Sequence, residues 1–178
     1  MPRGRGDADG AEGDQRRRAV LRREAARAAI AANTWCFAIT LAADGTPHAR
    51  LIQPGRLQED WSLRFLSDAR SRKVRELCRD PRLTLAWQHN AERAYVTLLG
   101  RAAVNAEAAA KRAIWRPEMD RFHPGGPEDP NNVIVEFAAE RLEIYSGARG
   151  IAPPPRGFSA ATLTRKDGSW SLGASFPG

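Results

Sequence analysis

Hydrophobic and polar residues alternate along most of this chain in short runs, a pattern typical of β-strands with one buried face. In TWCFAITL, residues 34–41, the apolar side chains of Trp35, Phe37, Ile39 and Leu41 fall on one face. Asp44-Gly45 then predicts a tight hairpin turn. Further strands are predicted in PHARLIQP (47–54), WSLRFLS (61–67), RLTLAWQ (82–88), RAYVTLLGRAAV (93–104), VIVEFAAERLEIYS (133–146), FSAATLT (158–164) and SWSL (169–172).

Helical patterns are fewer than strand patterns. Ala and Arg residues favour a helix over 15–32, with a thin apolar stripe of Leu21, Ala25, Ala28 and Ala32. Ser71 is a suitable N-cap for a short helix over Arg72 to Arg79, which Asp80-Pro81 would end, and a third helix is predicted over 106–115.

Strands and helices do not alternate along the sequence as they would in a protein with a parallel sheet. The predicted fold class is therefore mainly β with α additions, a small antiparallel barrel. Gly100, inside a long strand pattern, predicts a bulge or bend. Residues 1–14 have almost nothing to bury and are expected to form a disordered, dispensable tail, with residues 15–178 as a single domain.

Composition changes this picture little. The formal net charge of +7 suggests nucleic acid, but the basic residues are nearly all arginines and form no stripe with aromatic residues, so no nucleic-acid partner is predicted. No apolar stretch is long enough to span a bilayer, and the N-terminus lacks the apolar core of a secretory signal. Two separated cysteines, Cys36 and Cys78, predict no disulfide framework, and a cytoplasmic location is expected.

Familiar catalytic motifs are absent from the sequence. It has no G-x-S-x-G elbow, no phosphate-binding G-x-x-x-x-G-K-[ST] loop and no H-E-x-x-H helix. His48, His89 and His123 are isolated from one another, so no metal site is predicted. We therefore name no catalytic residue and no hydrolytic nucleophile.

One cluster of cations stands out. In SDARSRKV, residues 67–74, Arg72 and Lys73 follow Ser67 and Ser71 where a strand ends and a helix begins. Helix N-termini favour anions, and hydroxyl and ammonium groups there suit a phosphate. Arg50, in the middle of an earlier strand, could reach the same anion, although a solvated turn and an outward-facing arginine explain each feature taken alone.

These elements together resemble the pyridoxamine 5'-phosphate oxidase-like family of FMN-binding split barrels. The resemblance rests on DGTPHARLIQP, LRFLSDARSRKVRELCRDPRLTLAW and YVTLLGRAAV, and covers roughly residues 33–146. It implies an FMN-binding flavoprotein, and an FMN-dependent oxidoreductase, that forms a homodimer with the flavin at the subunit seam.

The resemblance also implies which residues hold the cofactor. Arg50 and Lys73 would bind the FMN phosphate, with Arg72 and Ser67 assisting. The residues expected to contact the flavin ring are Leu51, Ile52, Gln53, Leu66 and Tyr95.

The substrate is left open, because the features of a true pyridoxamine 5'-phosphate oxidase are missing. Gly55 stands where those enzymes have a lysine, and AAAKRAIWRPEMDRFHPGG lacks their Tyr, Arg and Ser set for the substrate phosphate. The alternatives are a non-catalytic flavin-binding or stress-related protein, a deazaflavin- or haem-binding protein of the same fold, an oxidase with a rearranged substrate site, and a basic nucleic-acid binder. The electron donor and acceptor are not predicted.

Overall fold

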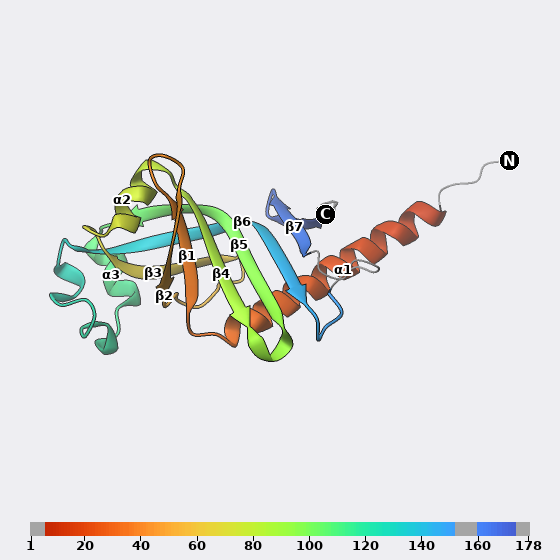
Figure 1. Ribbon diagram of the computed structural model, residues 1–178, viewed down its shortest axis with the longest axis horizontal. Helices are drawn as coiled ribbons and strands as arrows, with labels where there is room; N and C mark the ends of the chain where they lie inside the picture. The colour runs from red at the N-terminus through yellow and green to blue at the C-terminus, as the bar shows by residue number, and fades with distance from the viewer. Residues whose placement is uncertain (1–5, 152–159, 174–178) are drawn as a thin grey trace. The chain divides into compact units, whose positions relative to one another are not determined.

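The computed structural model describes residues 6–151 and 160–173. The helices are α1 (Gly6–Ala31), α2 (Arg72–Arg79) and α3 (Ala108–Ile114), with short 3-10 turns at Asn90–Glu92, Pro117–Met119 and Gly126–Glu128. The strands are β1 (Cys36–Leu41), β2 (Pro47–Ile52), β3 (Ser62–Asp68), β4 (Arg82–His89), β5 (Ala94–Asn105), β6 (Asn132–Ser146), β7 (Ala161–Lys166) and β8 (Ser169–Leu172). Figure 1 shows their succession along the chain.

The strands form one sheet in the order β2-β1-β4-β5-β6-β7-β8, and β3 pairs with β6. Within it, β1 pairs antiparallel with β2 and with β4, and β7 with β8. The long strand β6 pairs antiparallel with β3 over its first half and with β7 over its second half. The prediction of a mainly antiparallel β protein with helical additions is confirmed.

The chain divides into two compact units, and the single domain expected from the sequence stays a prediction. One unit comprises residues 34–86 and 99–139, and the other comprises 1–33, 87–98 and 140–178. We describe each by itself.

The unit of residues 34–86 and 99–139 carries the candidate anion site. Its core contains Leu63, Phe65, Leu83, Leu85 and Phe137, all buried on strands β3, β4 and β6. Asp44-Gly45 makes the predicted turn between β1 and β2, with Gly45 at a φ of 85°. Helix α2 packs on β1 and lies beside the β1–β2 hairpin (Figure 1).

Strand β1 turns its larger side chains outward. Phe37 is 50% exposed, whereas Cys36, Ala38 and Thr40 are buried on the opposite face. The alternation of β1 was predicted correctly. However, the face with the larger apolar residues, which includes Phe37, is not the face buried in the core of this unit.

The other unit contains α1, which packs on β8. The buried face of α1 consists of Ala19, Ala25, Ala26, Ala29 and Ile30. The predicted stripe was therefore wrong except at Ala25, since Leu21 is 54% exposed.

The N-terminal tail also differs from expectation. Helix α1 begins at Gly6, so residues 6–14, which we expected to be disordered, are helical. Ion pairs one turn apart, Arg16 with Glu12 and Arg18 with Asp14, favour helix in this polar stretch. Residues 1–5 lie outside the described part of the chain.

Candidate anion-binding site

The strand-to-helix junction after β3 has the predicted local structure. Ser71 is extended and its Oγ accepts a hydrogen bond from the Val74 N–H at 3.4 Å, which caps α2. Ser67 is buried, and its Oγ lies 3.3 Å from the Ser71 Oγ. The first N–H groups of the helix, those of Arg72 and Lys73, have no acceptor within α2, and its first turn contains no acidic residue. Two hydroxyls and free amides thus converge where an anion would be stabilised.

Beside this junction lies a carboxylate that the sequence interpretation missed. Glu76, in the second turn of α2, has a side chain only 5% exposed. Its Oε1 lies 2.6 Å from His48 Nδ1, and its Oε2 lies 3.0 Å from Arg50 Nη2 and accepts a hydrogen bond from the Thr40 hydroxyl. These contacts join α2 to both strands of the β1–β2 hairpin.

Glu76 is ionised at neutral pH. Burial on its own raises the pKa of the Glu76 carboxyl, but hydrogen bonds from Thr40, His48 and Arg50 outweigh it and lower the pKa to about 2. Because a carboxylate only accepts hydrogen bonds, His48 Nδ1 carries a proton and the Thr40 hydroxyl donates. The Thr40 Oγ is then free to accept from Arg50 Nη1, as it does.

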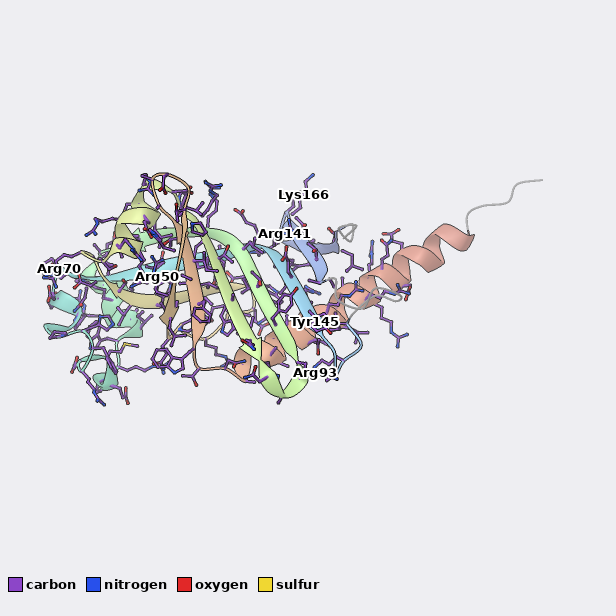
Figure 2. All side chains as sticks on the ribbon, viewed as in Figure 1. Arg50, Arg70, Arg93, Arg141, Tyr145 and Lys166 are labelled. Atoms are coloured by element: carbon purple, nitrogen blue, oxygen red, sulfur yellow. The ribbon has the colours of Figure 1, made fainter. Side chains whose placement is uncertain are left out.

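Arg50 points inward, which excludes the interpretation of an outward arginine on an exposed face. Its side chain is 20% exposed, and His48, Arg50 and Ile52 share the inner face of β2. Figure 2 marks Arg50 on this strand. Nη1 and Nη2 are bound by Thr40 and Glu76, so the guanidinium is fixed in one orientation.

Lys73 differs from Arg50 and Arg70 in having no hydrogen-bonded partner among the described residues. Within residues 6–151 and 160–173, no acceptor binds its half-buried ammonium, although Asp68 attracts it from a distance. Burial lowers the pKa of Lys73, and the nearby charge of Arg50 lowers it further. Two cations lie close together here, and the carboxylate beside them contacts Arg50 directly.

The remaining cations of SDARSRKV are placed differently. Arg70 lies in the turn before α2, at the position marked in Figure 2, and forms an ion pair of 2.7 Å with Asp68. Arg72 is 59% exposed, with its Nε 3.7 Å from Glu76 Oε1. Arg70 is therefore engaged in a local surface pair, while Arg72 lies at the rim of the Glu76 cluster.

The residues expected at the flavin ring do not form one surface of side chains. Leu51 is 57% exposed and Ile52 is buried on the opposite face of β2, and Gln53 follows the strand. Leu66 likewise points away from the buried Ser67 on β3. Tyr95 belongs to the other compact unit, where its ring stacks on Tyr145 with centroids 5.9 Å apart.

The missed residue, Glu76, left a weak signal in the sequence. Its spacing of four residues from Arg72 and three from Lys73 places it on their side of the helix. That spacing indicates a helical ion pair, but nothing local indicates Thr40, His48 and Arg50 as its partners.

Two further features bear on the kind of site. Across the described residues, no group of three or more His, Cys, Asp or Glu side chains could hold a metal ion. In the same residues, no helix combines the length and apolar character needed to cross a membrane.

Comparisons with known proteins identify the family of the chain. The family model for pyridoxamine 5'-phosphate oxidase matches residues 23–146. General stress protein 26 of Bacillus subtilis is 26% identical over 105 residues, which is 57% of this chain and 73% of that protein. The chain therefore belongs to the pyridoxamine 5'-phosphate oxidase-like family.

Solved structures show the same split-barrel fold. A Clostridium acetobutylicum protein related to general stress protein 26 has a TM-score of 0.63 at 17% identity, covering 79% of this chain and 92% of its own. A pyridoxamine 5'-phosphate oxidase-related, FMN-binding protein from Nostoc punctiforme has a TM-score of 0.58 at 18% identity, covering 99% of each chain. A haem-binding protein from Mycobacterium smegmatis has a TM-score of 0.58 at 20% identity, covering 78% and 56%. The predicted family and fold are confirmed, and the cofactor is not fixed by the fold alone.

Proposed function

We propose that the protein is an FMN-binding flavoprotein and an FMN-dependent oxidoreductase whose cofactor phosphate is held between β2, the end of β3 and the start of α2. One observation carries the proposal: the half-buried Lys73 ammonium has no hydrogen-bonded acceptor among the described residues, although it lies near Arg50. A helix N-terminus disfavours a cation unless an anion is also present. A phosphate dianion would satisfy the ammonium, the free amides and the serine hydroxyls together.

The residues present fit that group. Lys73 offers a point charge, Arg50 a guanidinium fixed by Thr40 and Glu76, and Ser67 and Ser71 two hydroxyls. Arg72 contributes positive charge at the exposed rim. When bound, FMN supplies the redox chemistry, and the protein binds and orients it.

The flavin ring is proposed to follow the chain segments next to the phosphate site. Backbone groups of Leu51 and Ile52 on β2, and of Gln53 directly after it, would support the ring, together with Leu66 on β3. Side-chain support from both Leu51 and Ile52 at once is not part of the proposal, because they point to opposite faces.

A homodimer is the second part of the proposal. Trp35, Phe37 and Leu51 are each at least half exposed, and Phe37 and Leu51 are direct partners across the β1–β2 pairing. Aromatic and aliphatic side chains gathered in this way suit a protein interface better than water. A second copy of the chain is the proposed occupant of this surface.

The experiment begins with the purified protein as it is expressed. Its absorption spectrum is recorded, the protein is denatured, and the released compound is identified by mass and chromatography. We expect FMN. A haem spectrum, a deazaflavin, or failure to bind added FMN would each overturn the proposal.

The phosphate site is then tested by comparing two ligands that share a ring. Protein freed of cofactor is titrated with FMN and with riboflavin, which lacks the phosphate, by quenching of flavin fluorescence. Lys73→Ala should weaken FMN binding about ten- to hundred-fold, as expected for a lost charge-assisted contact, and should leave riboflavin unchanged. Arg70→Ala is the matched control, because Arg70 is already paired with Asp68, and it should change neither. If both substitutions had equally small effects on FMN binding, SDARSRKV would be only a solvated turn, and the proposed phosphate site would be wrong.

A further inference from the structure

We propose that Glu76 is a positioning residue that holds Arg50 and Lys73 at the spacing a phosphate requires. The inference rests on the proposed function and extends it to a carboxylate beside an anion site, where a negative charge would ordinarily weaken binding. The two cations sit on different elements, Arg50 on β2 and Lys73 on α2. Glu76 is the side chain that binds both elements to each other.

The contacts of Glu76 are those of a bridge. Glu76 lies on α2, and its Oε2 accepts hydrogen bonds from Arg50 of β2 at 3.0 Å and from the hydroxyl of Thr40 of β1. Its Oε1 lies 2.6 Å from Nδ1 of His48 of β2. In the β1–β2 pairing, Thr40 lies opposite His48 and Ala38 lies opposite Arg50, so all three partners come from one inward face of the hairpin. The carboxylate therefore fixes the hairpin against the helix at one place.

Arg50 depends on this bridge for its orientation. Its two terminal nitrogens bind Glu76 and Thr40, and Thr40 is itself held by donating to Glu76. Without the carboxylate, the charge of Lys73 would repel Arg50. The arginine would lose Glu76 as an acceptor, and the Thr40 hydroxyl, no longer held by Glu76, would rotate freely. A ligand would then have to bring the two cations together itself, which lowers its affinity.

Positioning and net charge predict opposite results, which makes the proposal testable. If charge alone mattered, Glu76→Gln would make the site more positive and tighten FMN binding, while Glu76→Asp, which keeps the charge, would change nothing. If position matters, both substitutions weaken FMN binding, because glutamine pairs poorly with the guanidinium and aspartate is one methylene too short to reach it.

The measured quantity is the preference for FMN over riboflavin, the ratio of their dissociation constants, in protein freed of cofactor. We expect Glu76→Gln and Glu76→Asp each to lower this preference about tenfold or more, which corresponds to about 1.4 kcal/mol. Riboflavin serves as an internal control, since damage to the whole fold weakens both ligands. Glu136→Gln removes the same charge from a strand carboxylate of the same unit that pairs with Arg64 instead, and it should leave the preference unchanged.

A second pair of variants covers the case in which the Glu76 variants do not fold. Thr40→Val removes the hydroxyl that links Arg50 to Glu76 without changing any charge and should lower the preference, while Thr40→Ser keeps the hydroxyl and should retain it. A preference that rises in Glu76→Gln and holds in Glu76→Asp, or affinities for both flavins that fall equally, would overturn the positioning role. A wild-type protein with no preference for FMN would instead overturn the proposed function.

Discussion

Replacing Gly100 by alanine should destabilise the protein strongly, because the two strands there are too close for any side chain. A Cβ at Gly100 on β5 would lie 2.0 Å from the Ala138 carbonyl oxygen and 3.0 Å from the Ala139 Cα, both on β6. An ordinary contact between carbon and oxygen is about 3.3 Å, so the strands must separate by roughly 1 Å. Backbone hydrogen bonds near 2.9 Å would lengthen beyond useful range at that separation.

The expected cost combines crowding with weakened pairing. Crowding in a packed region costs about 1–3 kcal/mol, and each backbone hydrogen bond lost adds about 1 kcal/mol. We expect roughly 3 kcal/mol or more, a fall in melting temperature of about 6–12 °C for a chain of this length. Thermal unfolding followed by circular dichroism measures this fall, and a variant that melts with the wild type would refute the reasoning.

Gly13→Ala is the matched control, since the same substitution should have the opposite sign there. A Cβ at Gly13 meets no heavy atom within 4 Å, and the residue lies inside α1. Alanine is favoured over glycine in a helix by about 1 kcal/mol, so the melting temperature should rise slightly. No change at all would indicate that the first turns of α1 do not fold with the rest, as the sequence had suggested.

Three further predictions follow from the site and its surroundings. Because the pKa of Glu76 is lowered from 4.5 to about 2, its contribution to stability is complete above pH 4.5 and is lost as the pH falls towards 2. Acid unfolding of Glu76→Gln should lack this contribution, while those of Asp68 and Asp80 are kept. Identical acid unfolding curves for the wild type and the variant would contradict this role of Glu76. Phe37→Glu should turn the proposed dimer into a monomer in sedimentation, while the aromatic control Phe122→Glu, at a residue that is 68% exposed against 50% for Phe37, should not, and a monomeric wild type would contradict the dimer. Turnover of pyridoxamine 5'-phosphate, followed by oxygen consumption, should be weak, because Gly55 supplies no cation and a Cβ there would lie 2.6 Å from the Arg64 carbonyl oxygen; turnover matching a dedicated oxidase would disprove this.

Local features of the site were predictable from the sequence because each depends on neighbours in the chain. Ser71 caps α2 as predicted, and Asp80 ends it, since capping involves residues three or four positions apart. The hairpin at Asp44-Gly45 is equally local. Placing Arg50 near Lys73 required the family resemblance, because nothing in either segment encodes their separation in space.

Features that depend on packing could not be predicted in the same way. Glu76 lies in a polar helix whose pattern shows only Arg72 and Lys73 as neighbours, so its burial against Thr40, His48 and Arg50 is visible only in the structure. The outward face of β1 illustrates the same limit. Alternation identifies two faces of a strand, but which one packs within the chain depends on what covers it.

Gly100 shows that one residue type can be explained in two ways. A bulge or bend was predicted at Gly100, which lies inside β5 (Ala94–Asn105), and the structure shows that the glycine is required by close approach to β6. Both explanations need a residue without a Cβ, so the sequence alone does not separate them.

The charged and hydroxyl side chains that could bind a ligand lie at the proposed phosphate site. Arg50, Ser67 and Glu76 are held by contacts within the compact unit that also contains Lys73, so a phosphate at the proposed site would be bound inside a single unit of the chain. The flavin ring, in the proposed arrangement, meets mainly backbone of β2 and the exposed Leu51. Binding energy concentrated on the phosphate would hold the cofactor while leaving its reactive face to be shaped by other residues. Members of one family could then keep the same phosphate site and act on different substrates, which explains why a cofactor is easier to propose from this chain than a substrate.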